Sequence, residues 1–351
     1  MPSDLIETLR QLVGTENVLT GADATPNYRD QRGNFVGNAL AVVLPADTQQ
    51  VSAVVTYCAE HQISVVPQGG NTSLCGASVP LAAVEQLQIV LNLSRMTRIR
   101  SVDPTNYTIT VETGCTLTSV REVAAQHNRL FPLSLTAIEW RCEIGGNLST
   151  NAGGIGVLRY GNMRDLVLGL EVVLPDGRIW NGLRRLRKDN SGYDLKQLFI
   201  GAEGTLGIIT AAVLKLSPRP RSIATACVAV RDPAAAVELL AYMRSICGDR
   251  ISSFEIVGRS CLDIVFKHVP DTQEPFAKQY DWMVITELSD PLDVPLDGAL
   301  HGALSTFTGG IGEFAVTLDQ DKAESWWKLR KVISDAQKID GVSIKHDISV
   351  P

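Results

Sequence analysis

Apolar and polar positions follow two different periods along the first part of the chain, and each change of period marks a new element. Residues 39–44 form a short apolar run, which predicts a buried strand. A helix capped by Thr48 is predicted next, because apolar side chains recur at i, i+3, i+4 and i+7 counted from Val51. The apolar run 63–66 predicts a second strand, so this segment reads as a strand–helix–strand unit with parallel strands.

The same two periods predict the other elements. An N-terminal helix capped by Asp4 precedes the strand–helix–strand unit. Strands are predicted at 88–93, 107–112, 166–174, 208–216, 224–230 and 283–287, with a last strand-like run from Ser343. Helices are predicted at 118–127, 234–246 and 322–337.

The Ser-Pro-Arg-Pro stretch at 217–220 is the strongest candidate for a domain boundary. We therefore expect one domain over residues 1–217, built from two subdomains of about 1–95 and 96–217, and a second domain over 218–351. The second domain stops within a strand-like run that no helix follows, so we expect it to be truncated.

Composition narrows the class of protein. Hydrophobic residues make up 45% and charged residues 20% of the chain, which is enough for a large core, and no apolar stretch is long enough to predict a transmembrane segment. The net charge of −6 argues against nucleic acid as a partner. The seven cysteines are odd in number and contain no C-x-x-C, which favours a reducing compartment and a cytoplasmic location.

Glycine-rich segments carry the clearest chemical signal. They read PQGGNTSLCGAS at 67–78 and GGNLSTNAGG at 145–154, and GAEGTLGII at 201–209 repeats the pattern before a strand. Backbone N–H groups that side chains do not obstruct can surround a phosphate or a diphosphate. Neither the ATP P-loop motif nor the G-x-G-x-x-G of nicotinamide enzymes occurs. The three segments together indicate a different nucleotide cofactor.

Six blocks carry a family resemblance, in the order VVPQGGNTSLCGASVP, IGGNLSTNAGG, RYGNMRDLVLGLEVVLPDG, GAEGTLGII, WWKLRKVIS and KHDISVP. They resemble the FAD-linked oxidases with the vanillyl-alcohol-oxidase-like fold, in the branch of D-lactate dehydrogenases, the large glycolate oxidase subunit and D-2-hydroxyglutarate dehydrogenases. The resemblance implies an α+β fold: a PCMH-type FAD-binding domain of two α+β subdomains, followed by an incomplete antiparallel-sheet substrate (cap) domain.

The resemblance also implies which residues bind FAD. The first loop lacks the histidine to which flavin is covalently attached in some relatives, so we expect non-covalent FAD. Ser73 stands where glycine is common in the family, and a positive φ there would cost roughly 1 kcal/mol. The implied cofactor-binding residues are Pro67, Gly69, Gly70, Asn71, Thr72, Ser73, Leu74, Gly76, Ser78, Gly145, Gly146, Thr150, Asn151, Gly153, Gly154, Glu203, Gly204 and Ile209.

The last two blocks imply a substrate site made of Arg330, Ser334 and Lys345. Arg330 and Ser334 are four residues apart on the predicted helix and should share one face, with Lys345 on the following strand. A guanidinium offers paired donors to a carboxylate, and the other two residues would add hydrogen bonds. His346 would point away from Lys345 on that strand, which argues against its being the catalytic base.

The activity implied by the resemblance is FAD-dependent oxidation of a D-2-hydroxy acid to the 2-oxo acid, with hydride transfer to the flavin N5. The substrate could be 2-hydroxyglutarate, lactate or glycolate, and the three carboxylate-binding residues favour the first. The expected electron acceptor is an electron-transfer flavoprotein or a quinone, and a dimer or hetero-oligomer remains open.

Relatives continue past the equivalent of Pro351 with an H-x-G-D-G-N-x-x-H segment and a later Glu-His pair that supply a metal site and a base. This chain has neither, so we expect no metal and leave the catalytic residues unassigned. The chain would then be a shortened enzyme, one completed by a partner, or inactive. The alternative function is a non-catalytic FAD-binding subunit of a hetero-oligomeric dehydrogenase.

Overall fold

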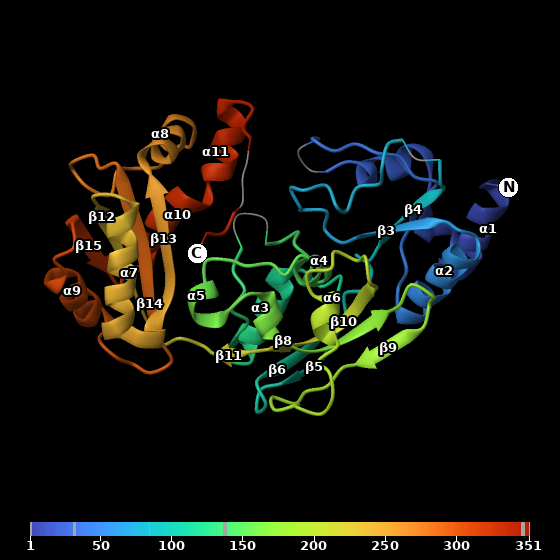
Figure 1. Ribbon diagram of the computed structural model, residues 1–351, viewed down its shortest axis with the longest axis horizontal. Coiled ribbons are helices and arrows are strands. Elements are labelled where there is room, and N and C mark those ends of the chain that lie inside the picture. The colour runs from blue at the N-terminus through green and yellow to red at the C-terminus, as the bar shows by residue number, and fades with distance from the viewer. Residues whose placement is uncertain (1, 31–32, 84, 136–138, 345–347, 351) are drawn as a thin grey trace. The chain divides into compact units, whose positions relative to one another are not determined.

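Residues 2–30, 33–83, 85–135, 139–344 and 348–350 are described by the computed structural model (Figure 1). They divide into two compact units. The first contains most residues up to Pro218, and the second contains Gly154–Tyr160 together with the residues from Arg219 onward. Within the described ranges, no helix has the length and apolar character needed to cross a membrane.

The first sheet of the first unit is mixed, with strand order β1-β2-β4-β3. Strands β2 and β3 run parallel to β4, and β1 runs antiparallel to β2. The predicted strand–helix–strand unit is confirmed, with β4 lying between its two strands. The strands are β1 (Val18–Leu19), β2 (Val42–Val43), β3 (Ser64–Gln68) and β4 (Gln88–Asn92). The helices beside them are α1 (Pro2–Val13), η1 (Thr15–Asn17), η2 (Gly21–Tyr28) and α2 (Thr48–Glu60).

The start of α2 differs from the prediction by one residue. The Asp47 carboxylate accepts a hydrogen bond from the main-chain N–H of Gln50 at 2.9 Å, so Asp47 rather than Thr48 caps the helix. Thr48 is buried, and its hydroxyl donates to Glu171 at 2.6 Å. Its side chain therefore joins α2 to a distant strand.

The second sheet of the first unit is antiparallel, with strand order β5-β6-β10-β8-β9. Its strands are β5 (Ile99–Asp103), β6 (Thr108–Glu112), β8 (Val167–Val173), β9 (Ile179–Gly182) and β10 (Ile208–Lys215). A short pair, β7 (Arg129–Leu130) with β11 (Ser217–Pro218), lies apart from it. The helices are α3 (Leu117–Gln126), α4 (Ile144–Ser149), η3 (Met163–Leu166) and α6 (Lys196–Phe199).

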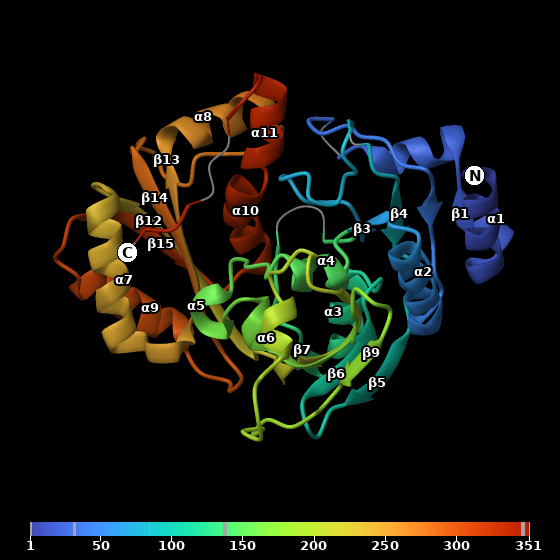
Figure 2. The ribbon, with the colours of Figure 1, turned by 45° about the vertical axis from the view of Figure 1, so that its right-hand side comes forward.

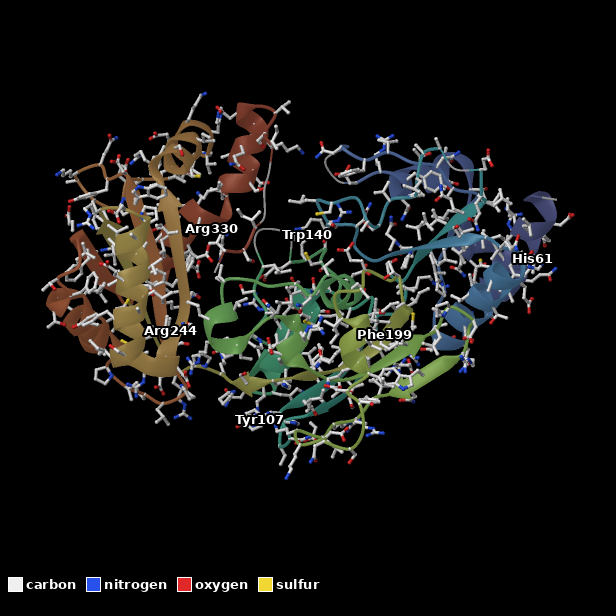
Figure 3. The ribbon with its side chains drawn as sticks, viewed as in Figure 1. His61, Tyr107, Trp140, Phe199, Arg244 and Arg330 are labelled. Atoms are coloured by element: carbon white, nitrogen blue, oxygen red, sulfur yellow. The ribbon has the colours of Figure 1, made fainter. Side chains whose placement is uncertain are left out.

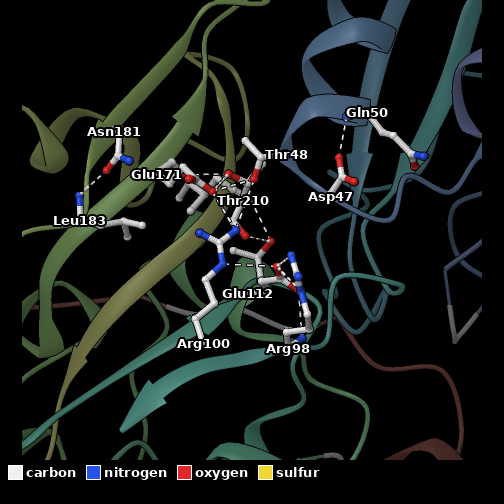
Figure 4. Close-up of polar contacts among 12 residues, drawn as sticks. Asp47, Thr48, Gln50, Arg98, Arg100, Glu112, Glu171, Asn181, Leu183 and Thr210 are labelled. Carbon is white, nitrogen blue, oxygen red and sulfur yellow. Dashed lines mark hydrogen bonds and ion pairs between the residues drawn. The ribbon is translucent and has the colours of Figure 1, made fainter. Parts of the chain in front are cut away.

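Apolar and polar contacts both join the two sheets of this unit. Val173 of β8 and Ile208 of β10 pack in the same buried cluster as the apolar faces of α1 and α2. Beside this core, Glu171 of β8 accepts from Arg100 at 3.0 Å as well as from Thr48 (Figure 4). The first unit is therefore held as one body around both sheets.

The second unit contains one antiparallel sheet with strand order β13-β14-β12-β15. Helices α7 and α9 cover one face, and α8, α10 and α11 cover the other (Figure 2). The strands are β12 (Ser222–Val230), β13 (Ile251–Gly258), β14 (Trp282–Asp290) and β15 (Ile311–Thr317). The helices are α5 (Val157–Tyr160), α7 (Pro233–Cys247), η4 (Gly248–Arg250), α8 (Arg259–His268), α9 (Leu296–Thr306), α10 (Gln320–Lys331) and α11 (Ile333–Asp340).

The helix predicted at 322–337 is two helices in the structure. Helix α10 ends at Lys331, and Val332 has a ψ of −1°, far from the value of about −42° that continues an α-helix. Because α10 and α11 each pack apolar residues into the same cluster, the chain turns between them. Of the strand-like run predicted from Ser343, residues 343–344 and 348–350 form no strand, and residues 345–347 lie outside the described residues.

These sheets and helices confirm the α+β fold expected from the sequence. In both units the sheets carry helices on their faces, and the glycine-rich segments lie mostly in the first unit, in the connections between strands and in α4.

Candidate functional site

The first glycine-rich segment contacts the residues that directly precede the second one in the folded chain. A Cβ atom placed on Gly70 would stand 1.8 Å from the carbonyl oxygen of Arg141, and one on Gly69 would stand 3.0 Å from Glu143 Oε2. Only a residue without a side chain allows the first approach. The loop that follows β3 therefore lies against the segment that leads into α4.

The third glycine-rich segment packs against the other two. Gly204 has a φ of +79°, and a Cβ there would stand 2.5 Å from the Pro67 side chain. The main-chain N–H of Glu203 donates to the Ser149 carbonyl at 2.9 Å, and that of Gly201 to Leu148 at 3.0 Å. All three segments thus converge within the first unit, although they are far apart in the sequence.

The loop after β3 offers a row of free donors. In the part of the chain that the structure describes, no main-chain N–H of residues 69–74 donates to a protein acceptor, whereas that of Cys75 donates to Ser73. Gly146 offers a further N–H of this kind, and no heavy atom of the described residues outside its own helix lies within 4 Å of the Cβ position there. Successive unpaired N–H groups are the donor set that binds a phosphate or a diphosphate.

Polar side chains of the same loop hold its shape. Asn71 has a φ of +53°, donates to the Arg29 carbonyl at 2.8 Å and accepts from Ser78 at 2.8 Å. The strain expected at Ser73 is absent, because Ser73 has no positive φ and Asn71 takes the left-handed conformation instead. Asparagine tolerates that conformation better than serine does. Because side chains make these contacts, the main-chain N–H groups of the loop remain available to a ligand.

The second loop is fixed in a similar way. Asn151 has a φ of +49°, and its side-chain oxygen accepts from the Arg164 N–H at 2.9 Å. Thr150 donates its hydroxyl to the Gly146 carbonyl at 2.9 Å. Gly145 is required for packing, because a Cβ there would stand 2.9 Å from the Thr113 side chain.

The other residues predicted to bind the cofactor have varied surroundings. The Ile209 side chain is buried in β10, and Glu203 is exposed with a φ of +51°. Gly153 is exposed in the first unit, whereas Gly154 belongs to the second unit, where its Cβ position is 2.0 Å from the Ser134 carbonyl oxygen. Their roles toward a cofactor stay predictions.

Two buried polar residues beside the loops were missed by the reasoning from sequence. Glu143 is 7% exposed and Asn147 is 5% exposed. Among the described residues, Glu143 Oε2 and Asn147 Nδ2 have no hydrogen-bond partner. Burial raises the pKa of the Glu143 carboxyl to about 8. The signal in the sequence was a single acidic residue within the otherwise uncharged run CEIGGN.

Arg330, labelled in Figure 3, lies on α10 of the second unit. Its Nε donates to the Glu255 carboxylate of β13 at 2.6 Å. Ser334 lies on α11, so the expectation that it shares a helix face with Arg330 is wrong. Lys345 and His346 lie outside the described residues.

A second carboxylate of the same sheet lies close to α10. Glu287 of β14 accepts from the Ser252 hydroxyl at 2.8 Å, and Lys331 of α10 is near enough to act on it electrostatically. Burial nevertheless raises the pKa of Glu287. The side of β13 and β14 that faces α10 therefore combines carboxylates with the cationic end of a helix.

Two family models match the chain. The model described as FAD binding domain matches residues 39–182, and the one described as FAD linked oxidases, C-terminal domain, matches residues 219–351. The solved structure of alkyldihydroxyacetonephosphate synthase is similar in fold, with a TM-score of 0.75 and 19% identity over 92% of this chain and 64% of that chain.

Curated relatives are also similar to the chain. The mitochondrial D-2-hydroxyglutarate dehydrogenase of Arabidopsis thaliana is 32% identical over 349 residues, 99% of this chain and 62% of the relative. The protein of the same name from Danio rerio is 36% identical over 321 residues, 90% of this chain and 58% of the relative. The chain thus spans about three fifths of the length of these relatives.

The names of the relatives also correct the expected location. Both proteins are named mitochondrial, which overturns the cytoplasmic location expected from the cysteines. All seven cysteines are free in the structure, but free thiols indicate only a reducing environment and do not identify a compartment.

Proposed function

Because the chain belongs to the family of FAD-linked oxidases, with FAD as its cofactor, we propose that it oxidises a D-2-hydroxy acid to the corresponding 2-oxo acid. The convergence of three glycine-rich segments around the free N–H groups of residues 69–74 carries this proposal. Within this class, D-2-hydroxyglutarate is the proposed substrate, since it is the acid named in the relatives and carries two carboxylates.

The residues of the first unit fit the cofactor. A diphosphate needs several donors at close range, and residues 69–74 with Gly146 offer main-chain N–H groups that no described residue uses. Asn71 and Ser78 hold the loop in shape, so these donors are in place before the cofactor arrives. We propose that FAD binds here without a covalent link, in a domain formed by residues 1–217.

Arg330 is the proposed anchor for a substrate carboxylate in a substrate domain formed by residues 218–351. A guanidinium has five N–H donors, and the one on Nε is used by Glu255. In the described part of the second unit, nothing accepts from its two terminal nitrogens, which form the fork that matches a carboxylate. Ser334 and Lys345 complete this proposed substrate site.

Bound FAD supplies an acceptor for the hydride that leaves C2 of the hydroxy acid, while the hydroxyl proton leaves to a base. Arg330 would hold the carboxylate and so fix the direction in which C2 faces. Electrons are then expected to pass to an electron-transfer flavoprotein or a quinone, in a dimer or hetero-oligomer.

Anaerobic reduction of the FAD-loaded chain tests the proposal. D-2-hydroxyglutarate is expected to remove the visible absorption of the flavin, and L-2-hydroxyglutarate is the control of opposite configuration. D-lactate has one carboxylate, so its rate of flavin reduction tests whether the second carboxylate of D-2-hydroxyglutarate is needed. A yellow protein that dithionite reduces but no D-2-hydroxy acid does would contradict the proposal and would instead indicate a non-catalytic FAD-binding subunit.

A further inference from the structure

Glu143 lies where the loop after β3 contacts the residues that lead into α4. Its Oε2 is 3.0 Å from the Cβ position of Gly69, the first residue of the donor row. The side chain does not cap α4, and Oε2 has no hydrogen-bond partner in the described part of the chain. A buried carboxyl group that makes no such contact is not explained by the stability of the fold, because leaving it unpaired is costly.

Among the residues that the structure describes, no cation forms an ion pair with this carboxyl. Burial is the only cause of its shifted pKa. Arg141, two residues before it, is exposed and lies over the Trp140 ring at 5.7 Å. Helix α4 contains no charged residue, and neither do residues 69–74.

The other titratable groups near Glu143 stay uncharged or paired. Cys142 is next to it in the chain, and Cys115 follows β6; burial raises the pKa of both thiols, that of Cys115 to about 12. Glu112, at the end of β6, is paired with Arg98 and Arg100. Glu143 is therefore the group at this contact that changes charge just above neutral pH.

We propose that Glu143 is a proton-linked cofactor residue: its carboxyl must be protonated for FAD to bind tightly against residues 69–74, so FAD binding takes up a proton. The proposal rests on the cofactor site described above. A diphosphate beside this loop would repel a carboxylate at Gly69, and the repulsion is strong because Glu143 is buried and no described residue forms an ion pair with it. A neutral carboxyl avoids the repulsion.

The coupling has a defined sign. Below pH 7 the carboxyl is protonated with or without FAD, so the affinity should not depend on pH through this group. Above about pH 8 the free protein loses the proton, while the complex retains it to a higher pH because the diphosphate disfavours the carboxylate. The dissociation constant should then rise by up to about tenfold for each pH unit.

The test measures FAD binding rather than activity. The dissociation constant of the whole chain for FAD is measured from pH 6 to pH 9.5, and calorimetry at pH 8.5 in two buffers of different ionisation enthalpy counts the protons taken up. We expect the dissociation constant to rise about fivefold between pH 8 and pH 9, because the carboxyl is only half ionised at pH 8, with a fraction of a proton taken up at pH 8.5.

Glu143→Gln is the matched variant, because glutamine has nearly the same shape and remains neutral. It should bind FAD with a constant that changes little over this range and with no proton uptake at pH 8.5. A pH dependence shared by both proteins, or no proton uptake by the unmodified chain, would overturn the role of Glu143. Failure of the unmodified chain to bind FAD at any pH would overturn the cofactor site itself and the role of Glu143 with it. The proton count on the unmodified chain decides the matter even if the variant does not fold.

Discussion

Gly70 lies so close to the main-chain carbonyl of Arg141 that a methyl group on Gly70 would stand 1.8 Å from the carbonyl oxygen. This contact holds together two segments that the sequence separates widely. The glycine in the loop is therefore required by the protein itself, before any ligand is considered.

Replacing Gly70 by alanine should separate the two segments. We expect Gly70→Ala to lower the free energy of unfolding of the cofactor-free protein by about 2–4 kcal/mol, because the backbone must move to relieve the clash. Urea unfolding of the protein without FAD measures this. Gly146→Ala is the control, since no heavy atom of the described residues outside its own helix lies within 4 Å of its Cβ position, and it should change stability by less than about 1 kcal/mol.

The same two variants distinguish a glycine needed for packing within the protein from a glycine needed for close approach of the ligand. If Gly146 faces the cofactor, Gly146→Ala should weaken FAD binding while leaving stability nearly unchanged. Equal losses of stability in both variants would contradict the packing role assigned to Gly70.

Glu143 should make the cofactor-free protein less stable as the pH rises. Its pKa in the fold is about 8 against an ordinary value of 4.5, so the folded state binds a proton that the unfolded state lacks between these values. The free energy of unfolding should therefore fall from pH 5 to pH 8, by an upper limit of roughly 4 kcal/mol. Glu143→Gln should abolish this part of the pH dependence in urea unfolding at both pH values. If the free energy of unfolding changed with pH in the same way in both proteins, the Glu143 carboxyl would not have a raised pKa.

Glu171 should have the opposite pH dependence. Burial alone would raise its pKa, but hydrogen bonds from Arg100, Thr48 and Thr210 outweigh that effect and the pKa lies below its usual value (Figure 4). The stabilisation is therefore present above the ordinary value near 4.5 and is lost as the pH falls through the lowered pKa. The unmodified protein should lose more stability than Glu171→Gln on acidification below pH 4.5.

At pH 7, Glu171→Gln should cost about 2 kcal/mol, because Arg100 loses a charged partner and keeps its contacts with Glu112 and the Thr48 hydroxyl. Asp176→Asn removes an exposed ion pair with Arg178 and should cost less than about 1 kcal/mol. Thermal or urea unfolding of the three proteins checks this order. A cost for Glu171→Gln no larger than that for Asp176→Asn would show that the buried network adds little.

Arg330→Ala should abolish substrate recognition without loss of the cofactor. Flavin reduction by D-2-hydroxyglutarate should slow by roughly 10²-fold or more, while the protein remains yellow, because Arg330 lies in the second unit and the cofactor donors lie in the first. Lys338→Ala, an exposed cation on α11, is the control and should react like the unmodified chain. Rapid mixing under anaerobic conditions measures both rates.

Glu255→Gln tests whether the ion pair orients Arg330. The charged partner of Nε is lost but a hydrogen-bond acceptor remains, so we expect a weaker effect than that of Arg330→Ala, mainly on the substrate concentration needed for half-maximal reduction. If Glu255→Gln bound the substrate and reduced its flavin like the unmodified chain, Arg330 would need no charged partner for its orientation.

Local pattern accounts for much of the architecture. The strand–helix–strand unit around α2 could be predicted because its apolar spacing is decided within a few residues. The glycine-rich segments could be recognised for the same reason. The helix at 322–337 could not be resolved into α10 and α11, because its polar and apolar pattern continues across Val332 and only packing on the sheet causes the turn.

By itself, the sequence determined the strand–helix–strand unit, the α+β class and the glycine-rich character of the loop after β3, since each depends on residues close together in the chain. It did not predict several elements of the second unit, among them β13, α8, α9 and β15. Only the tertiary structure decided that Glu143 is buried against Gly69 and that Arg330 is paired with Glu255. The physical reason is that solvent exposure, charge pairing and pKa are set by neighbours in space. For these side chains, those neighbours come from parts of the chain that the local pattern cannot bring together.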